Sequence, residues 1–240
     1  MNPLQNEGWE GKDDKYPVQG EWSDILDKNE DQKRANTVGT FGHDMNTKGN
    51  NIMRVLVANV NGLNINEGWC KWNYTYQRMK EDGVDIVGLC ETNTKWDNNL
   101  RYEALREIKQ FGSASKLATS TSSEITSPEI QRGGTSLSVQ KKLVGRVTSV
   151  SEDKSKLGRW TYVRLQGKGT EMLTIMAVYR SHKSKMGDGS SYSQQRRLMR
   201  IQGIKNPDPR KQFMVDLVNA IRGWNKEGEI LVMGGFNSGL

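Results

Sequence analysis

The apolar residues of this chain are gathered into short runs of strand length, and this feature most constrains the fold. Such runs occupy residues 52–60, 84–90, 171–179 and 229–233. None approaches the roughly 18 consecutive apolar residues that a membrane-spanning helix needs, which excludes a transmembrane protein. Because the runs are rich in Val, Ile and Leu, they predict buried β-strands.

Amphipathic segments alternate with these strands. The spacing of apolar residues predicts helices over 72–81 and 98–110, and a short helix in the basic stretch 191–203. A further helix begins at Asp208-Pro209, since Asp is a good N-cap and Pro fits the first helical position. One face of that helix is apolar and consists of residues 213, 217, 221 and 224.

The middle of the chain predicts a loop followed by antiparallel strands. Residues 113–131 are rich in Ser and Thr and indicate a mobile surface loop. Four strand candidates follow and suggest an antiparallel meander, at 134–140, 143–150, 159–166 and 171–179. The whole order is β-α-β-α, four strands, then α-β, which predicts an α/β layered domain.

The charge is distributed unevenly along the 240 residues. Residues 1–50 carry 6 Lys/Arg and 10 Asp/Glu, and we expect a polar flexible leader there. The partial domain expected over 51–240 carries 29 Lys/Arg and 18 Asp/Glu, and residues 180–211 alone hold 9 basic and 2 acidic residues. A basic body suits a polyanion such as nucleic acid, although it is also compatible with an ordinary solvated surface.

Two cysteines, Cys70 and Cys90, cannot form a disulfide framework or a four-cysteine zinc site. They are expected to be reduced thiols in an intracellular protein, with Cys90 buried. The N-terminus has neither the basic head nor the apolar core of a secretory signal.

Polar residues follow the predicted strands at their carboxyl ends, where open α/β sheets commonly bind ligands. These residues are Asn59, Glu91, Tyr179, Arg180 and Asn237. Glu91 could bind Mg²⁺, a hard cation that prefers oxygen ligands, or could simply cap the loop that follows it. Taken singly, the asparagines are commoner in turns and a tyrosine is commoner in a core.

Two neighbouring features have simpler interpretations. His182 lies in a Lys/Ser-rich stretch and is expected to be solvated rather than catalytic. Gly133-Gly134 is expected to serve a turn or a close backbone approach.

Six short motifs, taken in order, are more specific than any of these residues alone. They are ANVNGLN (58–64), VGLCETNT (87–94), GGTSLSV (133–139), RWTYVRL (159–165), MAVYR (176–180) and ILVMGGFNSG (230–239). This set resembles the endonuclease/exonuclease/phosphatase superfamily, and within it the endonuclease domains of LINE-type retrotransposons. The resemblance covers roughly residues 52–240.

The resemblance implies a four-layered α/β sandwich that hydrolyses phosphodiesters of DNA with Mg²⁺ or Mn²⁺. It implies that Glu91 binds the metal and that Asn59 holds the site close to it. It implies that Tyr179 contacts the scissile phosphate and that Asn237 orients the phosphate and the attacking water. Arg180 and three further basic residues would contact the nucleic acid, namely Lys183, Arg196 and Arg197.

The sequence departs from the family pattern in two ways. The family's Gly-Asp-Phe-Asn reads Gly234-Gly235-Phe236-Asn237 here, so a proton-handling aspartate is replaced by Gly235. The family also has further strands and a Ser-Asp-His motif beyond the position of Leu240. We therefore expect a C-terminally truncated domain with the first sheet, an incomplete second sheet of one or two strands, and weak or lost activity.

Three functions remain open at this point. The first is a metal-dependent nuclease, whose full-length parent chain could carry a reverse transcriptase and act in the nucleus. The second is a non-catalytic remnant that binds nucleic acid through residues 180–211. The third is a phosphatase of the same superfamily that acts on phosphoinositides or other small phosphoesters.

Overall fold

The computed structural model describes residues 47–65, 68–111, 115–124, 131–184 and 189–237. The chain divides into two units, Met1–Thr47 and Lys48–Leu240, and the described residues belong almost entirely to the second. The predicted leader 1–50 lies largely outside the described residues and stays a prediction.

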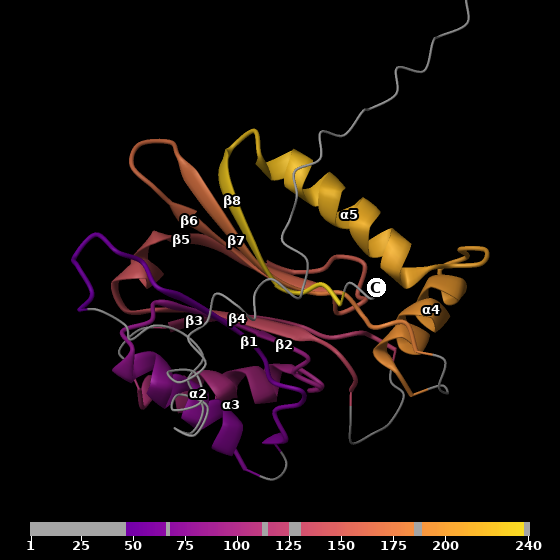
Figure 1. Ribbon diagram of the computed structural model, residues 1–240, viewed down its shortest axis with the longest axis horizontal. Helices are drawn as coiled ribbons and strands as arrows, with labels where there is room; N and C mark the ends of the chain where they lie inside the picture. The colour runs from indigo at the N-terminus through magenta and orange to yellow at the C-terminus, as the bar shows by residue number, and fades with distance from the viewer. Residues whose placement is uncertain (1–46, 66–67, 112–114, 125–130, 185–188, 238–240) are drawn as a thin grey trace, which may run out of the picture. The chain divides into compact units, whose positions relative to one another are not determined.

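The described chain forms two four-stranded sheets (Figure 1). The first has the order β1-β2-β4-β3, and its strands are β1 (Val55–Asn59), β2 (Ile86–Cys90), β4 (Thr135–Gln140) and β3 (Ser115–Ser120). The second has the order β5-β6-β7-β8, and its strands are β5 (Val147–Glu152), β6 (Trp160–Gln166), β7 (Met172–Tyr179) and β8 (Gly228–Gly235). The helices are α2 (Cys70–Glu81), α3 (Asn98–Lys109), the 3₁₀ helix η3 (Lys141–Arg146), α4 (Ser191–Ile201) and α5 (Pro209–Trp224).

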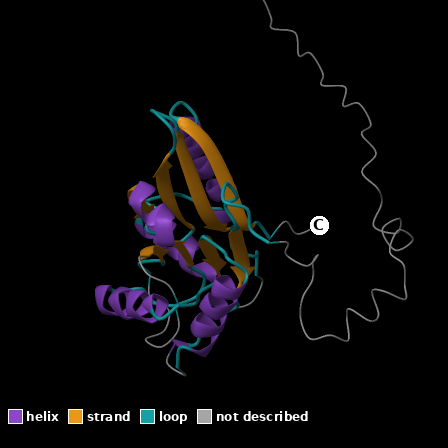
Figure 2. Ribbon diagram, turned by 90° about the vertical axis from the view of Figure 1, so that its left-hand side faces the viewer, coloured by secondary structure: helices purple, strands orange, loops and turns teal. Residues whose placement is uncertain are grey.

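The elements build four layers, with the helices outside and the sheets inside (Figures 1 and 2). Helices α2 and α3 pack on the outer face of the first sheet, where Tyr76 and Ile108 contact Val87 and its neighbours. Helix α5 packs on the outer face of the second sheet, where Phe213 and Leu217 lie against Met176 and Val178. The predicted α/β sandwich is therefore confirmed.

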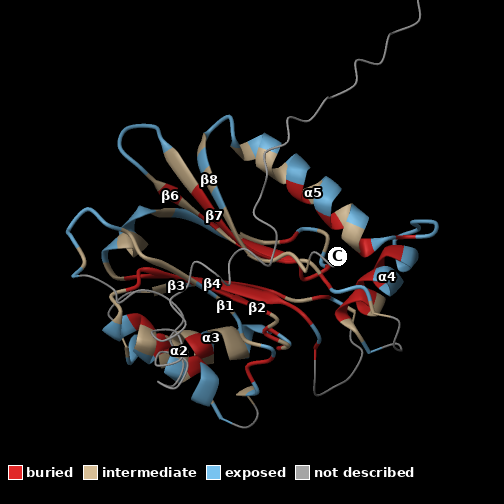
Figure 3. Ribbon diagram, viewed as in Figure 1, coloured by how far each residue is buried: buried red, intermediate tan, exposed pale blue. Residues whose placement is uncertain are grey.

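The two sheets face each other across a buried apolar core. Ile86 and Leu137 of the first sheet pack with Val163, Ile175 and Ala177 of the second. Figure 3 shows this burial along β2 and β4, in which every described residue is buried. Successive side chains of a strand point to opposite faces, so Ile175 and Ala177 line this core while Met176 and Val178 face α5.

The predicted start of α5 is confirmed in detail. The Asp208 carboxylate accepts hydrogen bonds from the backbone N–H groups of Arg210 (2.9 Å) and Lys211 (3.2 Å), and Pro209 occupies the first turn. Phe213 and Leu217 of the predicted apolar face are buried. None of the helices in the described ranges is long and apolar enough to cross a membrane.

The prediction of a mobile loop over 113–131 is wrong for its first part. Ser115–Ser120 form β3, which pairs antiparallel with β4 along its whole length. Ala118, Thr119 and Ser120 are buried, because Thr and Ser fit a pleated surface once neighbours cover them. Residues 125–130 lie outside the described residues.

The predicted four-stranded meander is also corrected. Strand β4 belongs to the first sheet, between β2 and β3, and only β5, β6 and β7 form an antiparallel meander. The segment 141–146 is the 3₁₀ helix that carries the chain from one sheet to the other. The second sheet has four strands rather than the one or two that the resemblance implied, because β5 to β8 all pair there.

Candidate functional site

The strands that carry the predicted site residues end at the same side of the sandwich. β1 and β2 are parallel, with Asn59 beside Cys90, and β7 and β8 are parallel, with Tyr179 beside Gly235. The Cys90 thiol donates a hydrogen bond to the Val178 carbonyl oxygen at 3.1 Å, which joins the end of β2 to the end of β7. The carboxyl ends of four strands from two sheets therefore converge.

A cavity of about 640 Å³ opens at this convergence, and Glu91 and Tyr179 both line it. Glu91 is the first residue after β2 and Tyr179 is the last residue of β7. The other walls include Asn93, Arg132 and Ser191. We call this space the Glu91 cavity.

The backbone around the cavity is strained at several non-glycine residues. Glu91 has a φ of 54°, Asn61 of 43° and Asn93 of 48°, all in the left-handed region. Asparagine tolerates that region, whereas glutamate rarely adopts it. Such conformations cost on the order of 1–3 kcal/mol each and are concentrated at functional sites. The strain at Glu91 is an independent observation that singles out this residue.

Asn93 and two glycines fix the loop opposite Glu91. The Asn93 Oδ1 atom accepts a hydrogen bond from the Gly133 N–H at 2.7 Å. The backbone N–H of Asn93 donates a second hydrogen bond to the Gly133 carbonyl oxygen at 2.8 Å. A Cβ atom on Gly134 would lie 2.8 Å from the Thr92 Oγ1 atom and 2.9 Å from the Ser120 carbonyl oxygen. The expected close backbone approach of the glycine pair is confirmed. Sequence reasoning did not assign Asn93 to the site, although its place three residues after a buried strand was a usable signal.

Tyr179 is buried, and its hydroxyl lies 3.4 Å from the Ser191 Oγ atom. Burial raises the pKa of the phenol to about 12, the hydrogen bond with Ser191 opposes this shift, and the nearby Glu91 carboxylate adds to it. The phenol is therefore protonated at neutral pH and can donate a hydrogen bond. Ser191 begins α4, whose N-cap Ser190 also lines the cavity.

Asn59 and Asn237 lie at the same ends of the sheets but do not line the Glu91 cavity among the residues described. The Asn59 side chain is exposed and its Oδ1 atom accepts a hydrogen bond from the Asn61 N–H at 3.0 Å. The Asn237 Nδ2 atom donates to the Arg180 carbonyl oxygen at 2.8 Å, so it lies beside the residue after Tyr179. The structure thus brings Glu91 and Tyr179 together and leaves the two asparagines at the margin.

Gly235 is paired with Tyr179 across the second sheet, and its position leaves room for the first atom of a side chain. A Cβ atom built on Gly235 would have the Tyr179 Cδ2 atom as its nearest neighbour, at an ordinary 3.5 Å. Its backbone is outside the left-handed region, so an L-residue fits. The Cβ atom of an aspartate at this position would therefore make only an ordinary contact with Tyr179.

The predicted nucleic-acid contacts differ in their accessibility. Lys183 and Arg196 are exposed, whereas Arg197 forms an ion pair with Glu124 at 3.1 Å. Arg180 is half-buried, and its pKa is lowered by desolvation and by the nearby Arg210 charge. Arg196 and Lys183 are thus the freest of the four to meet a polyanion.

Two further residues line the cavity that sequence reasoning did not assign to the site. Arg132 is exposed there and precedes the glycine pair. His182 is exposed, as its sequence context predicted, yet it also lines the cavity with Glu91 and Tyr179. Neither residue belongs to a recognisable motif by itself.

A divalent cation in the Glu91 cavity would need oxygen ligands from the side chains that line it. Glu91 is the one carboxylate among the described residues that line the cavity, and no group of three or more His, Cys, Asp or Glu side chains there could hold a metal. Mg²⁺ commonly uses only one or two carboxylates and completes its coordination with water and substrate phosphate. Glu91 fits a cation held in that way and does not fit a metal site enclosed by protein ligands.

Comparison with known proteins was made at three levels. No protein-family model matches the chain, and no curated protein matches it. Among solved structures, the chain is similar to an endonuclease/exonuclease/phosphatase family protein from Leptotrichia buccalis C-1013-b, at 13% identity over 65% of each chain and a TM-score of 0.40.

Two further similarities are of the same kind. A humanized D. rerio TDP2 gives 12% identity over 77% of this chain and 66% of that one, with a TM-score of 0.48. An AP endonuclease from Archaeoglobus fulgidus gives 15% identity over 62% of this chain and 49% of that one, with a TM-score of 0.37. The chain thus spans less than two thirds of the length of each of these three proteins.

Proposed function

We propose that the Glu91 cavity is a phosphodiesterase site that acts on the backbone of DNA with low turnover. One observation carries this proposal. Glu91 and Tyr179 come from different sheets, and both line one open cavity. A phosphate in this cavity would then lie close to two groups. One is a carboxylate that can hold a cation, and the other is a protonated phenol that can donate a hydrogen bond to an oxygen.

Two side chains and one helix end would bind and orient the substrate phosphate. The Tyr179 phenol donates a hydrogen bond to a phosphate oxygen, and the exposed Arg132 guanidinium adds positive charge. The N-terminal residues of α4 also line the cavity, and a helix N-terminus favours an anion. Asn237 donates to the Arg180 carbonyl and lies outside the cavity, so it would support the segment after Tyr179 rather than contact the phosphate directly.

Glu91 would hold the divalent cation. Asn59 ends the neighbouring strand β1 and lies outside the cavity, so it would support the site from there rather than line it. Mg²⁺ or Mn²⁺, when bound, supplies neutralisation of the charge that develops on the phosphate. The protein contributes the position of the carboxylate, at a residue whose backbone φ of 54° is in the left-handed region.

We expect low turnover because Gly235 stands where the family that the sequence resembles has a proton-handling aspartate. A proton-handling group contributes about 10²–10⁴ in rate, and glycine offers none at this position. The His182 imidazole also lines the cavity, and its two ring nitrogens can donate and accept hydrogen bonds there. We assign the remaining proton transfer to it.

DNA is preferred over a phosphoinositide headgroup because exposed basic residues extend away from the cavity along α4, as a long polyanion requires. The resemblance to LINE-type retrotransposon endonucleases supports the same substrate and a retroelement origin.

The test is nicking of supercoiled plasmid DNA by the full chain with Mg²⁺ or Mn²⁺. We expect slow nicking that decreases by about 10²–10³ in Glu91→Gln, because the charge that holds the cation beside the phosphate is removed. Glu171→Gln removes the same charge from an exposed position outside the cavity and is the matched control. Equal nicking by both variants would contradict the proposal.

A second candidate, binding without cleavage, is favoured by the glycine at 235 and by the single carboxylate. DNA binding without nicking, in every divalent metal tested, would establish it. Release of phosphate from a phosphoinositide without DNA binding would instead establish the phosphatase.

A further inference from the structure

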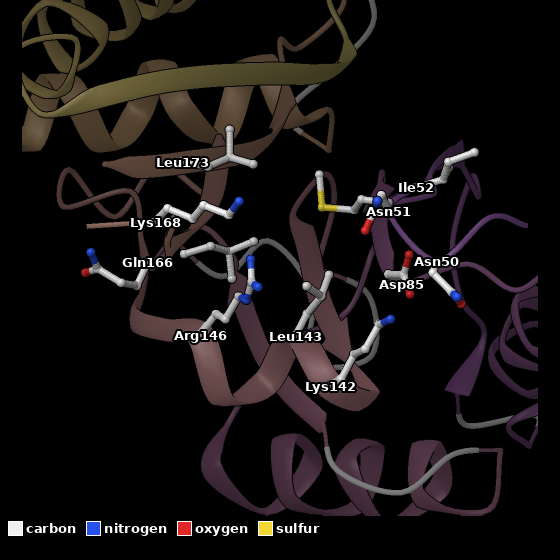
Figure 4. Close-up of a pocket in the computed structure, with 13 residues that line it drawn as sticks. Asn50, Asn51, Ile52, Asp85, Lys142, Leu143, Arg146, Gln166, Lys168 and Leu173 are labelled. Carbon is white, nitrogen blue, oxygen red and sulfur yellow. The ribbon is translucent and has the colours of Figure 1, made fainter. Parts of the chain in front are cut away.

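A second cavity, of about 710 Å³, lies at the opposite end of the sandwich from the Glu91 cavity (Figure 4). Met53 and Asp85 precede β1 and β2, and Leu173 lies at the start of β7, so this cavity opens at the amino ends of strands whose carboxyl ends form the Glu91 cavity. We call it the Leu173 cavity. Its volume lies in the range of small-molecule sites.

The apolar part of the Leu173 cavity is aliphatic. Leu165 is buried at its base, and four half-buried or exposed side chains complete it, namely Ile52, Met53, Leu143 and Leu173. Ile52 is 53% exposed, so part of this aliphatic surface is accessible to a ligand. No aromatic side chain is among the described lining residues.

Three cations surround this aliphatic surface. Lys142, Arg146 and Lys168 are exposed, and none of the three forms an ion pair with another described residue. Figure 4 shows Arg146 and Lys168 extending into the space from one side, whereas Gln166 turns away from it. The positive charge at this cavity is therefore available to a ligand.

The one acid in the lining does not neutralise these cations. Asp85 is buried, forms an ion pair with Lys48 and accepts a hydrogen bond from the Arg54 N–H at 2.9 Å. Lys48 therefore balances the charge of Asp85. Figure 4 shows that Asp85 lies across the cavity from Arg146 and Lys168.

We propose that the Leu173 cavity binds an anionic amphiphile, that is, a molecule with an aliphatic chain and one carboxylate or phosphate group. The chain lies on Leu143, Leu165 and Leu173, and the anionic group is bound by Arg146 and Lys168. A nucleotide is disfavoured, because proteins usually stack unpaired bases on aromatic side chains and none is among the described residues that line this cavity. This inference is independent of the function proposed for the Glu91 cavity.

The test is calorimetric titration of the full chain with decyl phosphate, with decanol and inorganic phosphate as controls. We expect decyl phosphate to bind more tightly than either control, because only it uses both halves of the cavity. The double charge reversal Arg146→Glu/Lys168→Glu should weaken binding by about tenfold or more for each cation removed. Lys154→Glu/Lys205→Glu makes the same change in net charge at exposed positions outside the cavity.

Equal affinity for decanol and decyl phosphate, or equal loss in both double variants, would overturn the proposal. Circular dichroism and melting of each variant show whether it has folded, and Leu173→Asn provides a second, uncharged test of the apolar half. Co-sedimentation with vesicles that contain phosphatidate separates two sources of the ligand. Binding that Arg146→Glu/Lys168→Glu abolishes assigns a membrane lipid, and binding to decyl phosphate alone assigns a free molecule.

Discussion

The thiol of Cys90 lies 3.1 Å from the carbonyl oxygen of Val178 and donates a hydrogen bond to it across the two sheets. Each of these residues is followed directly by a residue of the Glu91 cavity, Glu91 just after β2 and Tyr179 at the end of β7. Cys90 is fully buried. A buried side chain in the core therefore sets the separation of the two groups on which the proposed chemistry depends.

The first prediction concerns alkaline stability. Burial raises the pKa of the Cys90 thiol from 9.0 to about 11, opposed by a hydrogen bond with the Gly235 backbone and reinforced by Glu91. A raised pKa means that the folded state holds the proton more tightly than the unfolded state. Its stabilising contribution is complete below pH 9 and is lost as the pH rises to about 11.

Melting temperatures measured across this pH range should therefore decrease less steeply in Cys90→Ala than in the unchanged protein. Buried tyrosines also titrate at high pH, so the difference between the two curves is the informative quantity. Cys70→Ala removes an exposed thiol and should follow the unchanged protein. Parallel curves for all three proteins would contradict the assignment to Cys90.

The second prediction is that Gly235→Asp increases plasmid nicking. The position accepts a Cβ atom at 3.5 Å from Tyr179 without backbone strain, so the new carboxylate lies beside the phenol. We expect a gain of about 10²-fold, the lower end of the contribution of a proton-transfer group. Gly235→Asn is nearly isosteric and carries no charge, and an equal gain in that variant would rule out a role for the carboxylate.

The third prediction concerns the loop that Asn93 holds. Gly134→Ala places a Cβ atom 2.8 Å from Thr92 Oγ1, at a φ of 84° that alanine rarely adopts. The free energy of unfolding should decrease by about 1–3 kcal/mol, measured by urea denaturation. Gly223→Ala, in α5 with no atom within 4 Å of the new Cβ, should leave stability unchanged or raise it by up to about 1 kcal/mol. Equal effects of the two substitutions would contradict the close approach at Gly134.

The fourth prediction concerns the basic face of α4. Arg196 is exposed there, so Arg196→Glu should weaken DNA binding and reduce the slope of log affinity against log salt by about one. Arg222→Glu, on the exposed side of α5, is the control with the same charge change. A salt slope that changes equally in both variants would mean that α4 is not the binding face.

Several elements of this protein could be predicted from local sequence because their causes lie within a few residues. The start of α5 follows from Asp208 and Pro209, and its buried face follows from apolar residues at helical spacing. The buried strands β2 and β7 follow from their apolar runs. The polar residues at the ends of these strands were identified as site candidates for the same reason.

The sequence by itself therefore determined which segments become helices and most strands, and which side chains stand at strand ends. Only the tertiary structure decided that Ser115–Ser120 form a strand, that β4 belongs to the first sheet, and that His182 and Arg132 line the same cavity as Glu91. These outcomes depend on contacts between distant residues, as between Cys90 and Val178, which are 88 positions apart. Helix caps and apolar periodicity act locally, whereas sheet order and cavity walls are set by how whole layers pack.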